Sequence, residues 1–171
     1  MDAGKVQLGI ERINSEARLP FYAHEGDAGM DVCAAEHCIL APGETRPIRT
    51  GLKLAIPRGY EIQVRPRSGL SLKTPLRLPN SPGTIDSGYK DELMILMQNT
   101  SRADEGHYTV EDKGNCQGRY EIRPGDRIAQ LVMAPVVQAE LLQIDSAQAA
   151  SISETSNRGG GFGHSGMRHE D

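Results

Sequence analysis

LKLAIPRGYEIQV, residues 52–64, holds two short runs in which apolar side chains alternate with other side chains. In residues 52–56 every second side chain is Leu or Ile, and in residues 60–64 every second side chain is Tyr, Ile or Val. Alternation of this kind is typical of β-strands that bury one face. Pro57-Arg58-Gly59 lies between the runs and is typical of a turn. The stretch therefore predicts two consecutive strands.

The same signals recur along most of the chain. Residues 6–10 alternate in the same way, and the apolar runs 93–97 and 128–137 predict strands that are more fully buried. Further turns are indicated by Pro-Gly pairs at residues 42–43, 82–83 and 124–125. Many short strands with such turns predict an all-β barrel or sandwich, with a jelly roll favoured. The one helix expected in the body is a turn or two after Ser68.

Length and composition predict one domain with an extended tail. The chain has 171 residues, of which 37% are hydrophobic, enough for one core. From Ser146 onward the composition shifts to Ser, Gly, Ala, Gln and charged residues, which cannot bury enough surface to fold alone. We expect a β-barrel domain over residues 1–145 and a flexible arm over residues 146–171.

No segment predicts a membrane or an export pathway. There is no run of ~18 apolar residues, and the start MDAGKVQLGI resembles neither a secretory signal nor a transit peptide. Cys33, Cys38 and Cys116 form no CxxC pair and are expected to be free thiols that serve in packing. Zinc bound by Cys33, His37 and Cys38 would need ligands from elsewhere and is disfavoured. We expect a cytoplasmic protein with no membrane partner.

A basic segment lies directly before the stretch that holds the candidate catalytic residues. Residues 62–85 contain no Asp or Glu but four Arg or Lys, in a chain of formal net charge -4. This pattern favours a small anionic ligand over nucleic acid, the alternative being a solvated face. Next comes NSPGTIDSGY, residues 80–89, a predicted hairpin with a single acid, Asp86, and an aromatic, Tyr89.

The basic segment also contains the ingredients of a phosphate site. Arg67 can donate two hydrogen bonds to one phosphate, Ser68 can cap a helix, and Gly69 lets the backbone approach a ligand. The plainer interpretation of Ser68 is a helix cap without any ligand.

Five motifs in order identify a family. They are AGMD at residues 28–31, RSGL at 67–70, GTIDSGY at 83–89, GDRIAQ at 125–130 and RGGGFGHSG at 158–166. The chain thereby resembles the trimeric, all-β deoxyuridine triphosphate nucleotidohydrolases (dUTPases). The resemblance implies a jelly-roll-like distorted barrel, a homotrimer whose three sites each draw on three chains, and hydrolysis of dUTP to dUMP and pyrophosphate.

The resemblance assigns the nucleoside to the predicted hairpin. Asp86 would activate the water that attacks the α-phosphorus and would meet the 3′ hydroxyl of the sugar. Tyr89 would lie against the deoxyribose and exclude a 2′ hydroxyl. Uracil would be read by the backbone of residues 84–94 with the Asn80 side chain. The substrate-binding residues expected here are Asn80, Gly83, Thr84, Ile85, Asp86, Tyr89 and Met94.

The resemblance assigns the triphosphate to the other motifs. Arg67, Ser68 and Gly69 would hold the α and β phosphates, and Gln130 would lie near the attacking water. Mg²⁺, held mainly by the phosphates, would be bound by Asp31 through water. For Arg127 we favour a structural ion pair with Asp31. The arm would supply Arg158 to the γ phosphate, Phe162 to stack on uracil, and Gly163, His164 and Ser165 to contact the substrate.

The sequence departs from the family pattern in three places. Asp91 replaces a more usual Gly, the last motif is one residue shorter before its aromatic, and residues 100–120 form a longer polar segment. That segment is expected to be an exposed loop or extra hairpin, with a partner surface as the alternative.

Two rival functions remain at this point. A dCTP deaminase of the same fold would need a catalytic Glu in the strand after the hairpin, and residues 93–97 contain no acid. A non-catalytic nucleotide-binding trimer is disfavoured because Asp86, Gln130 and the Gly-rich arm are all present. Neither interpretation involves nucleic acid.

Overall fold

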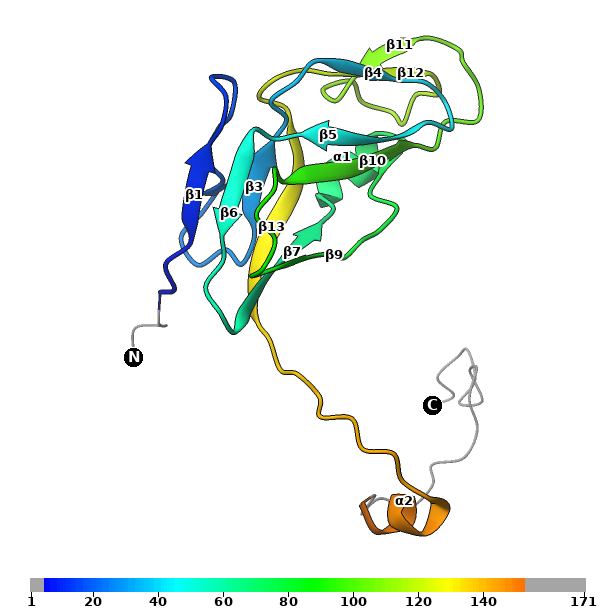
Figure 1. Ribbon diagram of the computed structural model, residues 1–171. Coiled ribbons are helices and arrows are strands. Elements are labelled where there is room, and N and C mark those ends of the chain that lie inside the picture. The colour runs from blue at the N-terminus through cyan, green and yellow to red at the C-terminus, as the bar shows by residue number, and fades with distance from the viewer. Residues whose placement is uncertain (1–4, 153–171) are drawn as a thin grey trace. The chain divides into compact units, whose positions relative to one another are not determined.

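The computed structural model describes residues 5–152 and divides into two units at Val137 and Gln138. The first unit is a β-body with one short helix (Figure 1). Its strands are β1 Gly9–Arg12, β2 Phe21–Tyr22, β3 Met30–Cys33, β4 Cys38–Leu40, β5 Thr45–Arg49, β6 Leu52–Ala55, β7 Tyr60–Arg65, β8 Leu76–Arg77, β9 Gly83–Asp86, β10 Met94–Asn99, β11 His107–Thr109, β12 Arg119–Ile122 and β13 Arg127–Pro135, and its helix is α1 Ser68–Lys73. The predicted all-β class is confirmed.

The largest sheet has five strands in the order β2-β3-β13-β7-β9. Strand β13 is antiparallel to both of its neighbours, with Gln130 opposite Asp31 on β3 and opposite Arg65 on β7. The strand ends at Pro135, two residues before the predicted limit. Strand β13 carries Gln130 of the fourth motif and pairs with β3, which carries Asp31 of the first motif. This sheet therefore positions the candidate site.

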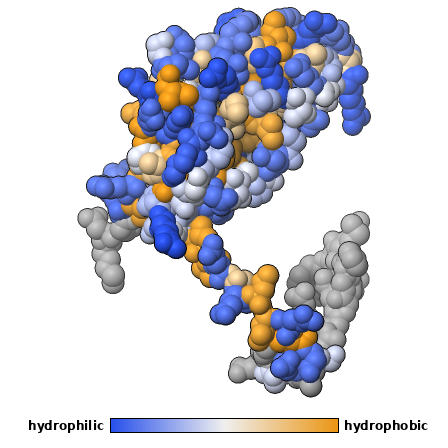
Figure 2. Space-filling view, viewed as in Figure 1, coloured by the Kyte–Doolittle hydropathy of each residue, from blue (hydrophilic) through white to orange (hydrophobic). Residues whose placement is uncertain are grey.

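Three smaller sheets complete the body. Their strand orders are β1-β6, β5-β10-β8 and β11-β12-β4. The sheets bury a core of aliphatic side chains, including Ile48, Ile62, Leu76, Ile95 and Leu131. Over the face shown in Figure 2, apolar side chains form separate patches on a largely hydrophilic surface. Burial of one face of each strand explains the alternation in the sequence.

Strand β10 differs from its prediction. It alternates between exposed and buried side chains, with Met94 43% and Leu96 37% exposed, while Ile95 and Met97 are buried. The apolar run LMILM predicted burial on both faces. The prediction failed because an apolar run has the same periodicity whether its second face is buried or exposed.

The predicted hairpin over residues 80–89 is wrong in its pairing. Strand β9 pairs with β7, and β10, which follows the turn, pairs with β5 and β8. The two strands that flank Asp86-Ser87-Gly88-Tyr89 therefore belong to different sheets. The outer edge of β9 has no partner strand among the described residues.

Residues 100–120 are built into the body rather than forming a free loop. Strand β11 pairs with β12 in parallel, and the Tyr108 and Tyr120 rings pack with centroids 5.8 Å apart. The backbone N–H of Asn115 donates to the carbonyl of Lys73, at the end of α1. The segment is thereby connected to the helix that carries the phosphate motif.

Asn99 ties this segment to the core. Its buried side-chain amide donates to the carbonyls of Leu40 (3.0 Å) and Gly118 (2.8 Å), and its Oδ1 accepts from the Ser101 N–H (3.0 Å). We predict that Asn99→Ala lowers the free energy of unfolding by about 3 kcal/mol, because three buried backbone groups lose their partner. Urea unfolding followed by circular dichroism measures this. Gln98→Ala, one residue earlier, should cost under ~1 kcal/mol; equal losses would contradict the role of Asn99.

The three cysteines are free thiols, and Cys33 and Cys38 are buried. Burial raises the pKa of the Cys38 thiol to about 11, so it stays protonated and packs as a small apolar group.

The second unit, residues 138–171, contains helix α2, Ser146–Ile152, within its described part. The first unit ends at Val137, and the expected division into a β-barrel domain over residues 1–145 and an arm over residues 146–171 stays a prediction. Among the described residues, no helix has the length and apolar character needed to cross a membrane.

Candidate active site

A cavity of about 420 Å³ opens between the first, second and fourth motifs. It gathers five of the predicted residues, namely Asp31, Arg67, Ser68, Gly69 and Gln130. They come from β3, the start of α1 and the middle of β13. The other lining residues are Ala23, Asp27, Ala28, Gly29 and Arg127. Residues far apart in sequence therefore meet in one cavity as predicted.

Asp31 holds two arginines at this cavity. Its Oδ1 accepts from Arg67 Nε at 2.8 Å, and its Oδ2 accepts from Arg127 Nη1 at 3.0 Å. The ion pair with Arg127 confirms the sequence-based interpretation, whereas the pair with Arg67 was not predicted. Arg67 Nη1 also donates to the Arg127 carbonyl at 3.1 Å. With two guanidinium groups against one carboxylate, the cluster of Asp31, Arg67 and Arg127 carries a net positive charge that suits an anion, while Asp27 adds a second carboxylate to the cavity lining.

The side chain of Gln130 is positioned where β13 lies close to β3 and to Gly29, just before β3. It lies opposite Asp31 in the β3–β13 ladder. A Cβ built on Gly29 would clash with Gln130 Oε1, so the glycine leaves the space that this amide occupies. The first motif therefore needs Gly29 for the position of Gln130.

We predict that Gly29→Ala reduces kcat for dUTP about tenfold with little loss of stability. The clash falls on the far end of a flexible side chain, so Gln130 can move aside but then leaves the position that the family resemblance gives it near the attacking water. Steady-state kinetics and thermal unfolding test this. Unchanged kcat in Gly29→Ala would contradict the role given to Gln130.

The start of α1 differs from its prediction. Arg67, not Ser68, is the N-cap residue, and no side chain caps the helix. Ser68 is the first helical residue. The first backbone N–H groups of a helix have no partner within it, so those of Ser68 and Gly69 remain available to phosphate oxygens at the cavity.

The predicted nucleoside residues lie around β9. The Tyr89 N–H donates to the Asp86 carbonyl at 3.0 Å, which closes a turn, and the Tyr89 hydroxyl donates to the Glu92 carbonyl at 2.8 Å. A Cβ on Gly83 would lie 3.2 Å from Asn80 Nδ2, so the Asn80 amide lies against this strand. Thr84 and Ile85 continue the strand, and Met94 begins β10.

The structure does not bring Asp86 to the cavity lined by Asp31, Arg67 and Gln130, which we call the phosphate cavity, in the same chain. Along the ladders Asp86 lies opposite Glu61, which lies opposite Ala134, four positions from Gln130. Four residues along a strand and two strand spacings across place Asp86 roughly 16 Å from Gln130. None of the residues 80–94 lines the cavity. Within one chain, the turn with Asp86 and the cavity are therefore separate.

The predicted arm residues and Arg127 differ from the other candidate residues. Arg158, Phe162, Gly163, His164 and Ser165 lie outside the described residues. Sequence reasoning gave Arg127 only a structural role, but it also lines the cavity. Its place within the GDRIAQ motif at residues 125–130 was the signal available.

Comparisons with known proteins agree on one family. A family model described as dUTPase matches residues 15–105. A deoxyuridine 5'-triphosphate nucleotidohydrolase of Zymomonas mobilis is 44% identical over 165 residues, covering 95% of this chain and 99% of the relative. Another, from Clostridium kluyveri, is 41% identical over 161 residues, covering 94% and 99%.

Solved structures of dUTPases are similar over most of the chain. A dUTPase of Staphylococcus bacteriophage 80alpha with dUpNHpp superposes with a TM-score of 0.81 at 31% identity, covering 95% of this chain and 100% of that one. A dUTPase from phage phi11 of S. aureus, a mutant described for its coordination of a structural Mg(II) ion, gives 0.74 at 34% identity, covering 82% and 98%.

Proposed function

The chain belongs to the dUTPase family and hydrolyses dUTP to dUMP and pyrophosphate; we propose that it does so in sites shared between the subunits of a homotrimer. The observation that carries the proposal is the separation within one chain. The phosphate cavity and the turn with Asp86 lie too far apart for one chain to use both on one nucleotide. Three-fold symmetry lets the Asp86 turn of one subunit face the cavity of the next.

In the proposed mechanism, the cavity fixes the phosphates. Arg67 and the N–H groups of Ser68 and Gly69 bind the α and β phosphates, and the Asp31 pair holds the Arg67 guanidinium in place. Gln130 lies beside them and orients the attacking water. Catalysis of phosphoryl transfer rests mainly on such positioning and on stabilisation of charge.

Asp86 supplies the base. Its side chain is exposed and forms no ion pair with any residue in 5–152, so it is free to accept a proton from water. Attack of that water on the α-phosphorus forms the new P–O bond as the bond to the β-phosphate oxygen breaks. The products are dUMP and pyrophosphate.

The strand β9 and its turn select the nucleotide. The free edge of β9 offers main-chain donors and acceptors to the uracil edge, with the Asn80 amide beside it. The Tyr89 hydroxyl is anchored to the Glu92 carbonyl, which fixes the ring where it would meet the sugar. A fixed ring at that position leaves no space for a 2′ hydroxyl.

Magnesium fits this site in an indirect role. Both Asp31 carboxylate oxygens already accept from arginines, which disfavours direct coordination, but each oxygen can still accept a hydrogen bond from a metal-bound water. Mg²⁺ keeps several waters and prefers phosphate oxygens. Bound there, the ion would neutralise phosphate charge in the transition state.

The arm completes the proposal. The expectation that residues 146–171 close over bound nucleotide, with Phe162 on the uracil and Arg158 at the γ phosphate, stays a prediction from the family resemblance, because residues 153–171 lie outside the described part of the chain. Free thiols support a reducing, cytoplasmic location. Removal of dUTP there would keep uracil out of DNA and supply dUMP for thymidylate synthesis.

The test is a substrate panel with purified protein. Incubation with dUTP, dCTP, dTTP and UTP, with pyrophosphate and ammonia measured separately, should give pyrophosphate from dUTP alone. Ammonia from dCTP would instead favour the deaminase alternative, although β10 contains no acid. Binding of dUTP without pyrophosphate release would favour a non-catalytic module.

A further inference from the structure

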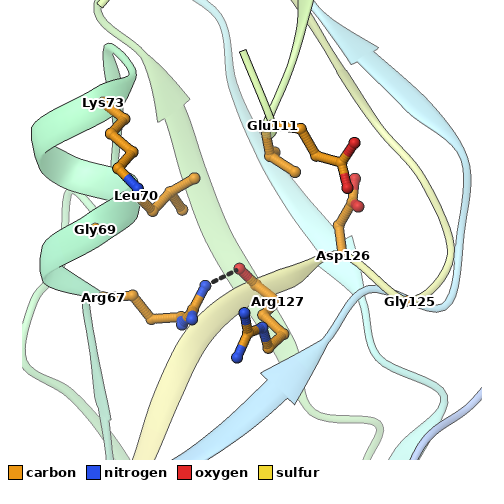
Figure 3. A pocket seen from close by; sticks show the side chains of 9 residues that line it. Arg67, Gly69, Leu70, Lys73, Glu111, Gly125, Asp126 and Arg127 are labelled. Atoms are coloured by element: carbon orange, nitrogen blue, oxygen red, sulfur yellow. Dashed lines mark hydrogen bonds between the residues drawn. The ribbon is translucent and has the colours of Figure 1, made fainter. Parts of the chain in front are cut away.

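A second cavity, of about 430 Å³, adjoins the phosphate cavity (Figure 3). Both cavities are lined by Arg67, Gly69 and Arg127, so they meet along the two arginines. The remaining walls come from α1, from the turn before β13 and from the 100–120 segment. The residues that line it are Arg67, Gly69, Leu70, Lys73, Val110, Glu111, Gly125, Asp126 and Arg127.

Two carboxylates form one side of this second cavity. Figure 3 shows the Glu111 and Asp126 carboxylates close together, on the opposite side of the cavity from α1. Neither forms an ion pair with a residue of the described chain. Burial raises the pKa of the Asp126 carboxyl, and the negative charge of Glu111 raises it further, against the hydrogen bond from the Arg123 N–H. The two carboxylates therefore place negative charge on this side of the cavity, while Lys73 lines the cavity from α1.

The Glu111 backbone is held in position by its turn. Asp112 Oδ2 accepts from the Thr109 N–H at 2.6 Å and from the Thr109 hydroxyl at 3.0 Å, and the Asp112 N–H donates to the Thr109 carbonyl. Thr109 is in turn paired with Glu121 in the β11–β12 ladder. Glu111 also lies beyond residue 105, where the match to the family model ends.

We propose that Glu111, with Asp126 behind it, lowers the affinity of the adjacent site for pyrophosphate and so promotes release of this product. The inference rests on the proposed function of the phosphate cavity. Arg67 and Arg127 attract phosphate from one side, and the two carboxylates act on the same guanidinium groups and on the same anion from the other side. Like charges repel over this range in a partly wet cavity.

The direction of the effect follows from the charge of the product. Pyrophosphate concentrates its charge on fewer atoms than bound dUTP and lacks the nucleoside contacts that hold the substrate. A negative wall therefore weakens product binding more than substrate binding. Glu111 acts through its field on the bound anion and takes no part in bond making.

The experiment is calorimetric titration of the full-length protein with inorganic pyrophosphate and Mg²⁺. In Glu111→Gln we expect the Kd to fall about threefold at low salt, the order expected for one charge acting across roughly 10 Å, and the difference to shrink at high salt. The inhibition constant of pyrophosphate in the dUTP assay should fall equally. Glu111→Asp, which keeps the charge, should behave like the unmodified protein.

The control is Glu105→Gln, on the same segment but lining a different cavity. It removes the same charge and should leave pyrophosphate binding unchanged. Equal or weaker pyrophosphate binding by Glu111→Gln in an active protein would overturn the inference, as would an equal effect of Glu105→Gln. Failure of the unmodified protein to release pyrophosphate from dUTP would instead count against the proposed function.

Discussion

Replacement of Asp86 by Asn should slow dUTP turnover by about 100-fold or more while dUTP binding is largely kept. The amide preserves the size of the side chain and its ability to meet a hydroxyl, but it cannot take a proton from the attacking water. Because Asp86 is exposed and the Tyr89 N–H bonds to its backbone carbonyl rather than its side chain, the turn should not change. Single-turnover kinetics with dUTP, alongside calorimetric binding of a non-hydrolysable analogue, separates the two effects.

Asp91→Asn is the matched control. Asp91 is an exposed acid five positions later, outside strand β10. It should retain near-normal turnover. If Asp86→Asn kept more than a tenth of the activity, or if both substitutions slowed the reaction equally, Asp86 would not be the base.

Arg67→Ala should lower kcat/KM for dUTP by about 100-fold. The substitution removes a bidentate donor to phosphate and leaves Asp31 paired with Arg127 alone. Charge-assisted hydrogen bonds contribute about 1.5–3 kcal/mol each, and more than one is lost here. Arg67→Lys should lose less, about tenfold, because an ammonium keeps the charge but not the planar donor pair.

Arg65→Ala provides the comparison for Arg67. Arg65 carries the same charge two positions earlier, but its side chain donates to Gln63 and does not line the cavity. Steady-state kinetics should show at most a twofold change. A loss at Arg65 as large as that at Arg67 would mean that general positive charge, and not the Asp31-held guanidinium, binds the phosphates.

The sequence predicted local structure well where one physical signal dominates. Alternation in residues 52–64 predicted β6 and β7, and the short helix predicted after Ser68 is α1, although Ser68 is its first residue and not its N-cap. The motif residues Asp31, Arg67 and Gln130 meet in one cavity as the family resemblance implied. In each case nearby residues, or a motif of fixed spacing, carry the information.

Pairing between distant strands could not be predicted in this way. The turn at Asp86–Tyr89 resembles that of a hairpin, yet β9 pairs with β7 and β10 with β5, because side-chain burial on the two sheets decides the partner. Apolar Met94 and Leu96 suggested a core strand, since a hydrophobic run does not distinguish an interior from a surface that another chain can cover. The Arg67–Asp31 ion pair joins residues 36 positions apart, and no local pattern indicates it.

The central claim is that the Asp86 turn and the phosphate cavity of one active site come from different chains. Co-expression of Arg67→Ala and Asp86→Asn chains in equal amounts tests it directly, because each variant retains the half that the other lacks. Random assembly into trimers should restore about a quarter of the unmodified activity per site, since one site needs an intact cavity from one variant and an intact Asp86 from the other. Activity that stays at the low level of the separate variants would contradict the account and would place the complete site within a single chain.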